Sequence, residues 1–211
     1  MLNDGLPKPN KVVQPGDAKY ADINDDNVID DNDKKYDGFP NRPEYVLGSN
    51  WKFGWKGFNL TLNWVGATNV SRKLFSDYCV PFTNSSHGRG LLQYFADNCW
   101  IDNDNPWAPG REDGTLPRFT NNNYEWNSYL SSLTVQDASY LRLKSASFGY
   151  TFTKGRLIDK LGIGSVGLMF TGYNILTFSK MTLQDPEAKS SDSDGTYPLV
   201  KTYNLALNIN F

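Results

Sequence analysis

The sequence predicts an all-β fold, an antiparallel transmembrane β-barrel segment of about five strands joined partly by long loops. The first observation is composition: 14% of the residues are Phe, Trp or Tyr and only 21% are charged, which favours strands and turns over helices in a chain rich in Asn and Gly. The second is apolar–polar alternation in several segments, the pattern of a strand with two different faces. The third is that short and long connections alternate along the chain, as they do in outer-membrane barrels.

The clearest alternation lies at the end of the chain, within a final strand predicted over Leu199 to Phe211. From Tyr203 to Phe211 the polar phase consists of Asn and Ala, and the apolar phase is wholly aliphatic or aromatic. In a transmembrane barrel the apolar phase faces lipid and the polar phase faces a water-filled lumen. The apolar phase is Tyr203, Leu205, Leu207, Ile209 and Phe211.

Four earlier segments show the same pattern. Alternation from Ser49 to Trp55 resumes from Phe58 to Trp64 after Lys56–Gly57, which predicts a β-hairpin with a two-residue turn. The segments 140–152 and 165–178 predict two further strands. In the first of these the apolar phase changes near Ser145, which predicts a β-bulge. Helical spacing predicts one helical turn over 153–162.

The connections sort by length. Each strand crosses the membrane once, so successive connections lie on opposite sides. If Phe211 lies on the periplasmic side, the long segments 1–44, 67–138 and 179–198 lie outside the cell and the short segments 56–57 and 153–163 lie in the periplasm. No apolar run is long enough for a transmembrane helix. The net charge of -2 argues against a nucleic-acid partner. The first residues do not read as a signal peptide, so we expect the chain to be a fragment of a longer exported protein.

An acidic segment near the N-terminus matches the ligand spacing of an EF-hand-type calcium loop. Calcium takes six to eight oxygen ligands, which alternate side chains of a tight loop can supply. Two residues depart from the pattern: Asn27 stands where Gly is usual, and the last ligand is a short Asp. The alternative is a solvated acidic loop. The candidate ligands are Asp22, Asn24, Asp26, the Val28 carbonyl, Asp30 and Asp33.

Other residues offer no catalytic constellation. Cys79 and Cys99 can form a disulfide in an oxidising compartment or remain two unpaired thiols. The single histidine, His87, has no nucleophile that it convincingly pairs with. Asp185 and Glu187 are interpreted as solvated loop acids. Aromatic residues of the second long connection either stack on sugar rings or pack the loop, and packing is favoured. These are Trp100, Trp107, Tyr124, Trp126 and Tyr129. We therefore expect no enzyme.

Several short motifs, in order along the chain from about residue 16, resemble the C-terminal portion of the SusC/RagA family of TonB-linked outer-membrane proteins. The most specific are Leu141-Arg142-Leu143-Lys144 and the segment around Asn174. The others are Gly16-Asp17 through Tyr20, Asp22-Ile23-Asn24 with Ile29-Asp30, the Lys56-Gly57-Phe58 hairpin, Ser139-Tyr140, Gly149-Tyr150, Gly172-Tyr173-Asn174-Ile175-Leu176-Thr177-Phe178 and the last strand ending in Phe211.

The resemblance implies a receptor in the outer membrane of a Gram-negative, Bacteroidetes-like bacterium. Such receptors import glycans or peptides with energy delivered through TonB, and they work with a SusD-like lipoprotein. Because five strands are too few to close a barrel, we expect residues 45–211 to be the last barrel strands of a larger protein and residues 1–44 to be an extracellular loop with the calcium-type motif. The polar phase predicts as lumen-facing residues Asn59, Asn63, Asn204, Asn208 and Asn210.

Two competing hypotheses remain. A secreted, calcium-stabilised carbohydrate-binding β protein explains the loop aromatics and the acidic loop, but not the apolar terminal strand or the alternating loop lengths. A surface adhesin or structural barrel with no transport role has the same strand pattern as the importer. An exposed apolar strand face is an aggregation hazard in water, which favours the membrane hypotheses.

Overall fold

The computed structural model describes residues 8–9, 12–74, 91–120, 126–129, 131–153, 155, 158, 160, 162–181, 183–188 and 199–211. The chain divides into two compact units built from discontinuous segments. One unit comprises Met1–Gly38, Lys73–Gln136 and Ser190–Gly195, and the other comprises Phe39–Arg72, Asp137–Lys189 and Thr196–Phe211. The division predicted from the sequence, 1–44 and 45–211, concerns topology across a membrane and stays a prediction.

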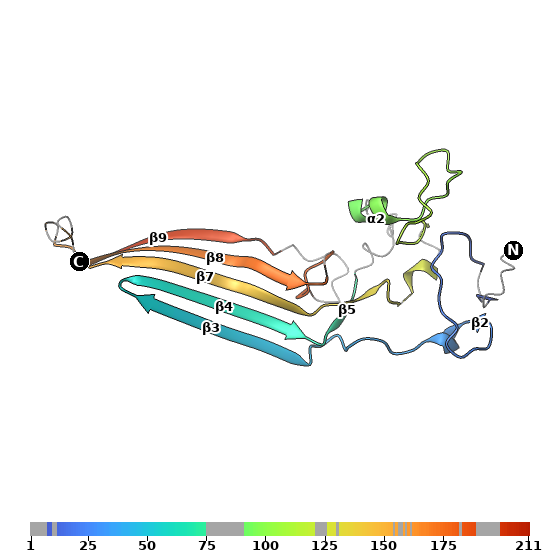
Figure 1. Ribbon diagram of the computed structural model, residues 1–211, viewed down its shortest axis with the longest axis horizontal. Coiled ribbons are helices and arrows are strands. Elements are labelled where there is room, and N and C mark those ends of the chain that lie inside the picture. Colours follow the sequence, from blue (N-terminus) through green and yellow to red (C-terminus); the bar gives the residue numbers. More distant parts are fainter. Residues whose placement is uncertain are drawn as a thin grey trace, which may run out of the picture. The chain divides into compact units, whose positions relative to one another are not determined.

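The second unit is built on one five-stranded sheet in which every neighbouring pair is antiparallel. The strand order is β3-β4-β7-β8-β9, so each strand lies beside the one that precedes it in this set (Figure 1). The prediction of about five antiparallel strands is confirmed. The strands are β3 (Tyr45–Trp55), β4 (Phe58–Thr68), β7 (Tyr140–Phe152), β8 (Ser165–Ser179) and β9 (Thr202–Asn210).

The predicted two-residue turn joins β3 to β4 at Lys56–Gly57. Both residues have positive φ, 45° at Lys56 and 90° at Gly57, as in the type I′ turn that matches the twist of a hairpin. A Cβ atom at Gly57 would lie 2.9 Å from the Thr151 carbonyl oxygen. Glycine is therefore required here both for its backbone conformation and for the close approach of β7.

The sheet has two irregularities. The first confirms the predicted bulge, and the second makes the last strand shorter than predicted. The register between β7 and β8 shifts between Leu143 and Ser145, and Asn174 of β8 has a φ of 52°. The ladder between β8 and β9 ends at Tyr173 and Thr202. The prediction that the strand begins at Leu199 is wrong, because the left-handed Asn174 ends the pairing and its side chain donates to the Val200 carbonyl at 3.2 Å.

The first unit contains short elements around a small apolar cluster. Ala18, Ile29 and Trp126 are buried together, with Tyr20 and Tyr129 packed against them. The long connection predicted over 67–138 is less irregular than expected, since β4 reaches Thr68 and short elements follow. The short elements of the chain are β1 (Lys8–Pro9), β2 (Val28–Ile29), η1 (Asp31–Asp33), β5 (Ser71–Lys73), α2 (Gln93–Asn98), η2 (Trp126–Ser128) and β6 (Val135–Asp137).

Helical structure is sparse. Of the helical turn predicted over 153–162, Ile158 and Lys160 are helical, and several of its other residues lie outside the described part of the chain. Among the described residues, no helix combines the length and the apolar character needed to cross a membrane. The all-β fold class is confirmed.

Candidate functional site

The five-stranded sheet has two chemically different faces. Residues directly opposite each other on neighbouring strands share a face, so the register assigns each paired residue to one of the two faces. One row across the sheet is wholly apolar and comprises Phe53, Leu60, Phe148, Phe170 and Leu205. The neighbouring row on the other face comprises Lys52, Thr61, Ser147, Thr171 and Asn204. The alternation predicted from the sequence is thus continuous from strand to strand.

Most large side chains of the apolar face are exposed or half-exposed. Trp51 is 54% exposed and Leu205 is 71% exposed, whereas Leu143, which lies opposite Trp64 and Leu176, is buried. Near the Lys56–Gly57 turn its aromatic rings form a continuous group: Phe58 lies 5.9 Å from Phe148 and 4.4 Å from Tyr150 between ring centroids. An apolar surface of this extent requires an apolar medium or a covering partner.

The polar face carries cross-strand hydrogen bonds between neutral side chains. Asn50 donates to Asn63, which in turn donates to Ser145 Oγ at 2.7 Å. Asn210 donates to Ser165 Oγ at 2.9 Å. The five asparagines predicted to line a lumen all lie on this face: Asn59, Asn63, Asn204, Asn208 and Asn210. Their exposure to a lumen stays a prediction.

Near the turn the polar face has a hollow of 370 Å³. Gly149 and Gly167 lie in its lining, where the absence of side chains leaves room, and Asn59, Asn208 and Asn210 contribute amides. These groups donate and accept hydrogen bonds without carrying charge. The hollow can therefore hold water or a neutral polar group.

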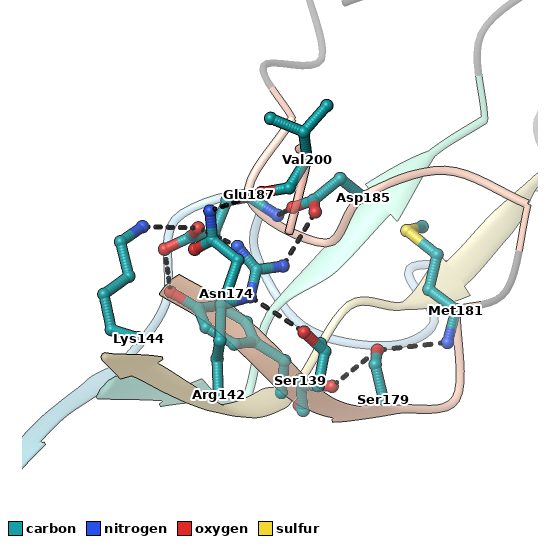
Figure 2. Close-up of polar contacts among 11 residues, drawn as sticks. Ser139, Arg142, Lys144, Asn174, Ser179, Met181, Asp185, Glu187 and Val200 are labelled. Atoms are coloured by element: carbon teal, nitrogen blue, oxygen red, sulfur yellow. Dashed lines mark hydrogen bonds and ion pairs between the residues drawn. The ribbon is translucent and has the colours of Figure 1, made fainter. Parts of the chain in front are cut away.

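At the other end of β7, the polar face holds a buried arginine. Arg142 is 1% exposed. Its guanidinium donates from Nε to Thr177 Oγ1 at 2.9 Å, from Nη2 to Asp185 Oδ2 at 2.7 Å and from Nη1 to Glu187 Oε2 (Figure 2). The guanidinium also lies 5.4 Å from the ring centroid of Tyr140. Two carboxylates thus neutralise one buried cation.

Glu187 joins this cluster to two further side chains of β7. Tyr140 donates its hydroxyl to Glu187 Oε1 at 2.7 Å, and Lys144 Nζ lies 3.4 Å from Oε2 (Figure 2). Burial would raise the pKa of Glu187, but the Tyr140 hydrogen bond and the Arg142 and Lys144 charges outweigh it, so the pKa lies below its usual range. Glu187 is therefore ionised at neutral pH.

The interpretation of Asp185 and Glu187 as solvated loop acids is wrong, because both bind Arg142. Sequence reasoning missed this cluster, although the sequence contained one signal. Arg142 lies in the polar phase of a strand whose neighbouring polar-face residues are mostly uncharged, and such a cation needs a carboxylate partner when buried. The partners lie 43 and 45 residues further along the chain, so only tertiary structure identifies them.

The predicted calcium ligands lie in a tight loop held by its own backbone. Asp25 and Asn27 have positive φ. The side chains of Asp22, Asp26 and Asp33 accept hydrogen bonds from backbone N–H groups of the loop at 2.8 Å. Backbone hydrogen bonds from Asp30 and Ile23 lower the pKa of Asp33. Asp33 is therefore ionised at neutral pH, and the hydrogen bonds hold the carboxylates of the loop in a fixed arrangement.

One oxygen of this loop fits a cation. Asp22 Oδ1 is buried and has no hydrogen-bond partner, which is costly for a carboxylate oxygen unless a cation or water approaches it. In the described part of the chain, however, no three His, Cys, Asp or Glu side chains are grouped closely enough to hold a metal ion. Calcium binding therefore stays a prediction.

The segment before the acidic loop is anchored by Asp17. Its carboxylate accepts from Arg118 Nε at 2.6 Å and from Asn127 Nδ2 at 3.0 Å, and the Asp17 side chain is 2% exposed. Trp126 donates its indole N–H to the Ala18 carbonyl at 2.8 Å. Burial raises the pKa of Tyr20, which donates to the Trp126 carbonyl, to about 12. These contacts confirm a packing role for Trp126.

The remaining sequence candidates are only partly described. Cys99 is a buried free thiol whose Sγ lies 3.9 Å from the Ala96 carbonyl oxygen, and burial raises its pKa. Cys79 and His87 lie outside the described residues, so the disulfide stays a prediction. Trp107 is 92% exposed and is thus not part of the packed loop core.

Comparison with known proteins shows which proteins the chain is similar to. The chain is 28% identical over 216 aligned residues to TonB-dependent receptor P3 of Formosa agariphila, covering 93% of this chain and 19% of that receptor. It is 27% identical to TonB-dependent receptor P26 of the same organism, covering 98% of this chain and 20% of the relative. The chain thus spans about a fifth of the length of these curated relatives. No family model matches it.

The fold gives the same result. The structure superposes on the RagAB peptide importer in its open-open state with a TM-score of 0.51 and 20% identity, over 81% of this chain and 17% of that chain. The chain is therefore similar to TonB-dependent receptors in sequence and to a RagAB chain in fold. The resemblance to SusC/RagA-type TonB-linked proteins is confirmed, and the similar proteins are receptors and transporters rather than enzymes.

Proposed function

We propose that this chain forms part of the barrel wall of an outer-membrane TonB-dependent nutrient importer. The observation that carries the proposal is the five-stranded sheet with one exposed apolar face and one polar face. Its strands have 9 to 15 residues, and about 9–11 residues suffice to cross a bilayer. The apolar face contacts lipid, and the asparagine-rich face lines the passage. The similarity to TonB-dependent receptors supports this assignment.

The substrate is a glycan or a peptide, and transport requires the complete receptor. In the part of the chain that the structure describes, no strand pairs with the outer edge of β3 or of β9, and further strands of the barrel would pair these edges. TonB acts through a part of the receptor outside this chain. A SusD-like lipoprotein is the second component, which the similarity to RagAB supports. Affinity purification from detergent-solubilised membranes of the native host tests this partner, and its absence from purified receptor would contradict it.

Calcium is the proposed ligand of the acidic loop. The unpartnered Asp22 Oδ1 and the ionised Asp33 support a site there, and the ion would hold the loop in one conformation. Titration calorimetry of the purified protein with CaCl₂ tests it. Binding that is lost in Asp22→Ala but kept in Asp31→Ala, which changes an acid outside the ligand set, supports the site. No heat of binding at millimolar calcium contradicts it.

Cell fractionation tests the membrane assignment. The protein, expressed from its native locus, is expected in the outer-membrane fraction, resistant to extraction by sodium carbonate and released by detergent. Recovery in the periplasm or the medium, folded without detergent, would contradict the proposal. That result would favour a secreted carbohydrate-binding protein instead. A control receptor of known location in the same preparation checks the fractionation.

A further inference from the structure

The connection between β8 and β9 contains a short segment that is packed rather than extended into solvent. Its described residues are 181 and 183–188. Met181 is 4% exposed, Gln184 is 9% exposed and Ala188 is 7% exposed. Asp185 closes a local turn, accepting from the Glu187 N–H with its side chain and from the Ala188 N–H with its carbonyl. We call residues 181–188 the strap.

The strap lies across the polar face of β7. Three alternate side chains of this strand, Tyr140, Arg142 and Lys144, all contact Glu187. Figure 2 shows Arg142 and Lys144 beside Glu187. Alternate side chains of a strand project from one face, and in β7 the Tyr140 and Arg142 positions belong to the polar face by register with Ala67 and Val65. Arg142 is covered because the strap closes over it.

The contacts place the strap at one end of the sheet. Tyr140 begins β7, whereas the Lys56–Gly57 turn lies beside Tyr150 and Thr151 at the other end. With the polar face as the wall of the passage, a segment folded over that wall narrows the passage at the end away from the turn. In the proposed orientation this end is the external mouth.

We propose that residues 181–188 form an inward-folded strap that narrows the mouth of the passage, and that Arg142 is the positioning residue that holds it there. The inference rests on the proposed function for the identity of the passage, but the strap itself is defined by contacts within one unit. Among the described residues of the strands, Arg142 is the one whose side chain bonds both strap carboxylates. Its fork of donors also reaches Thr177 of the neighbouring strand, which fixes the direction of the guanidinium.

The matched control is Lys52. It lies on the same face, in β3 opposite Thr61, and is exposed. In the part of the chain that the structure describes, no carboxylate forms an ion pair with it. Lys52→Met removes a positive charge from the same wall without touching the strap, whereas Arg142→Met removes the anchor. Arg142→Lys keeps the charge but lacks the planar fork that directs separate donors to Thr177, Asp185 and Glu187.

Amide hydrogen exchange of the purified protein, expressed in its native context, tests the strap. Arg142→Met is expected to speed exchange of peptides spanning 181–188 by about tenfold or more, because two partly buried carboxylates lose the buried cation that holds them. Arg142→Lys is expected to give a smaller increase, and Lys52→Met none. Exchange in β9 is expected to stay unchanged in all three. Unchanged exchange in the strap of Arg142→Met would overturn the inference.

If Arg142→Met does not fold, Asp185→Asn with Glu187→Gln removes the same ion pairs from the strap side. Faster exchange confined to 181–188 supports the inference, and no change overturns it. The exchange result does not depend on a membrane. Recovery of the protein in a soluble fraction would contradict the proposed function, while protected amides in 181–188 would still show the strap. Conversely, an outer-membrane protein with an unprotected strap would leave the proposed function standing.

Access to the passage tests the narrowing. Thr171 lies on the polar face opposite Ser147, further from the mouth than Arg142. In whole cells, a membrane-impermeant sulfonated maleimide should label Thr171→Cys at least about threefold faster when Arg142→Met is added. Lys52→Met should leave the rate unchanged. Background labelling of Cys79 and Cys99 is measured in protein that lacks the Thr171 substitution. Equal rates with and without Arg142 would contradict a strap that narrows the mouth.

Discussion

Arginine substitutions at two adjacent residues of β9 separate lipid from water as the medium around the sheet. Leu205 lies on the apolar face opposite Phe170, and Asn204 lies on the polar face opposite Thr171. Leu205 is next to Ala206, the middle residue of the nine-residue strand, and hence about 3.3 Å from the strand centre. The two residues are adjacent in one strand, so their depths differ by about 3.3 Å and the face is their main difference.

The expected magnitudes differ in the two media. An arginine facing lipid near the middle of the bilayer costs about 2–4 kcal/mol, whereas one facing a wet lumen is nearly neutral. Leu205→Arg should therefore unfold about 30-fold to 700-fold more readily than Asn204→Arg. If the sheet lay in water, the two variants would be about equally stable. Leu205 is already 71% exposed, and a substitution at an exposed position changes stability by about 0.5 kcal/mol or less.

Denaturant titration of the protein in phospholipid vesicles, followed by tryptophan fluorescence, measures both variants. A loss confined to Leu205→Arg supports a lipid-facing apolar surface. Equal stability of the two variants would refute the reasoning, as would a larger loss in Asn204→Arg. Leu205→Met, an apolar substitution at the same position, checks that the loss comes from the charge rather than from altered packing.

Three other predictions concern single features. Asp17→Ala should lower the free energy of unfolding of its unit by about 3–5 kcal/mol, because it removes the buried carboxylate that bonds Arg118 and Asn127, whereas Asp31→Ala, which removes an exposed pair, should cost less than about 1 kcal/mol; chemical denaturation compares them. Gly57→Ala should slow folding and destabilise the hairpin by about 1 kcal/mol or more, since φ is 90° and β7 lies close, and a wild-type denaturation midpoint would contradict this. The Glu187 contacts with Arg142 should weaken in acid: because the folded pKa is lowered, their contribution is complete above the unfolded pKa of about 4.3 and is lost as pH falls through the folded value. The rate of pepsin cleavage within 181–188 should then rise below about pH 4 in the native protein but vary less with pH in Glu187→Gln. If the cleavage rates of the two proteins depended on pH in the same way, Glu187 would not be the group responsible.

The strands were predictable because a two-faced sheet leaves a period-two pattern in each strand. Tyr140–Phe152 matches its prediction at both ends, and the change of phase near Ser145 located the bulge. The start of β3 was missed since Val46 and Leu47 are both apolar and Gly48 interrupts the alternation. The end of the β8–β9 ladder depends on the left-handed Asn174, whose effect on Leu199 and Val200 is a tertiary one.

The polar residues show where sequence reasoning ends. The asparagines of the polar face were predictable because a local pattern assigns their face. Asp185 and Glu187 were not, since two acids around a proline in a polar connection have the same local pattern whether solvated or bound to a buried arginine. The contacts of Asp17 with Arg118 and Asn127 are likewise separated by 101 and 110 residues. Pairing over such distances in the chain is a property of the fold.

Lipid contact of the apolar face is the central claim, and photolabelling measures it most directly. Outer-membrane vesicles from the native host are irradiated with a lipid-soluble diazirine, and the modified residues are identified by mass spectrometry. The account predicts adducts at Trp51, Phe53, Phe148, Phe170, Leu205 and Leu207, with Asn50, Thr61, Ser147, Thr171 and Asn204 unmodified. Adducts spread equally over both faces, or confined to the asparagine-rich face, would contradict it.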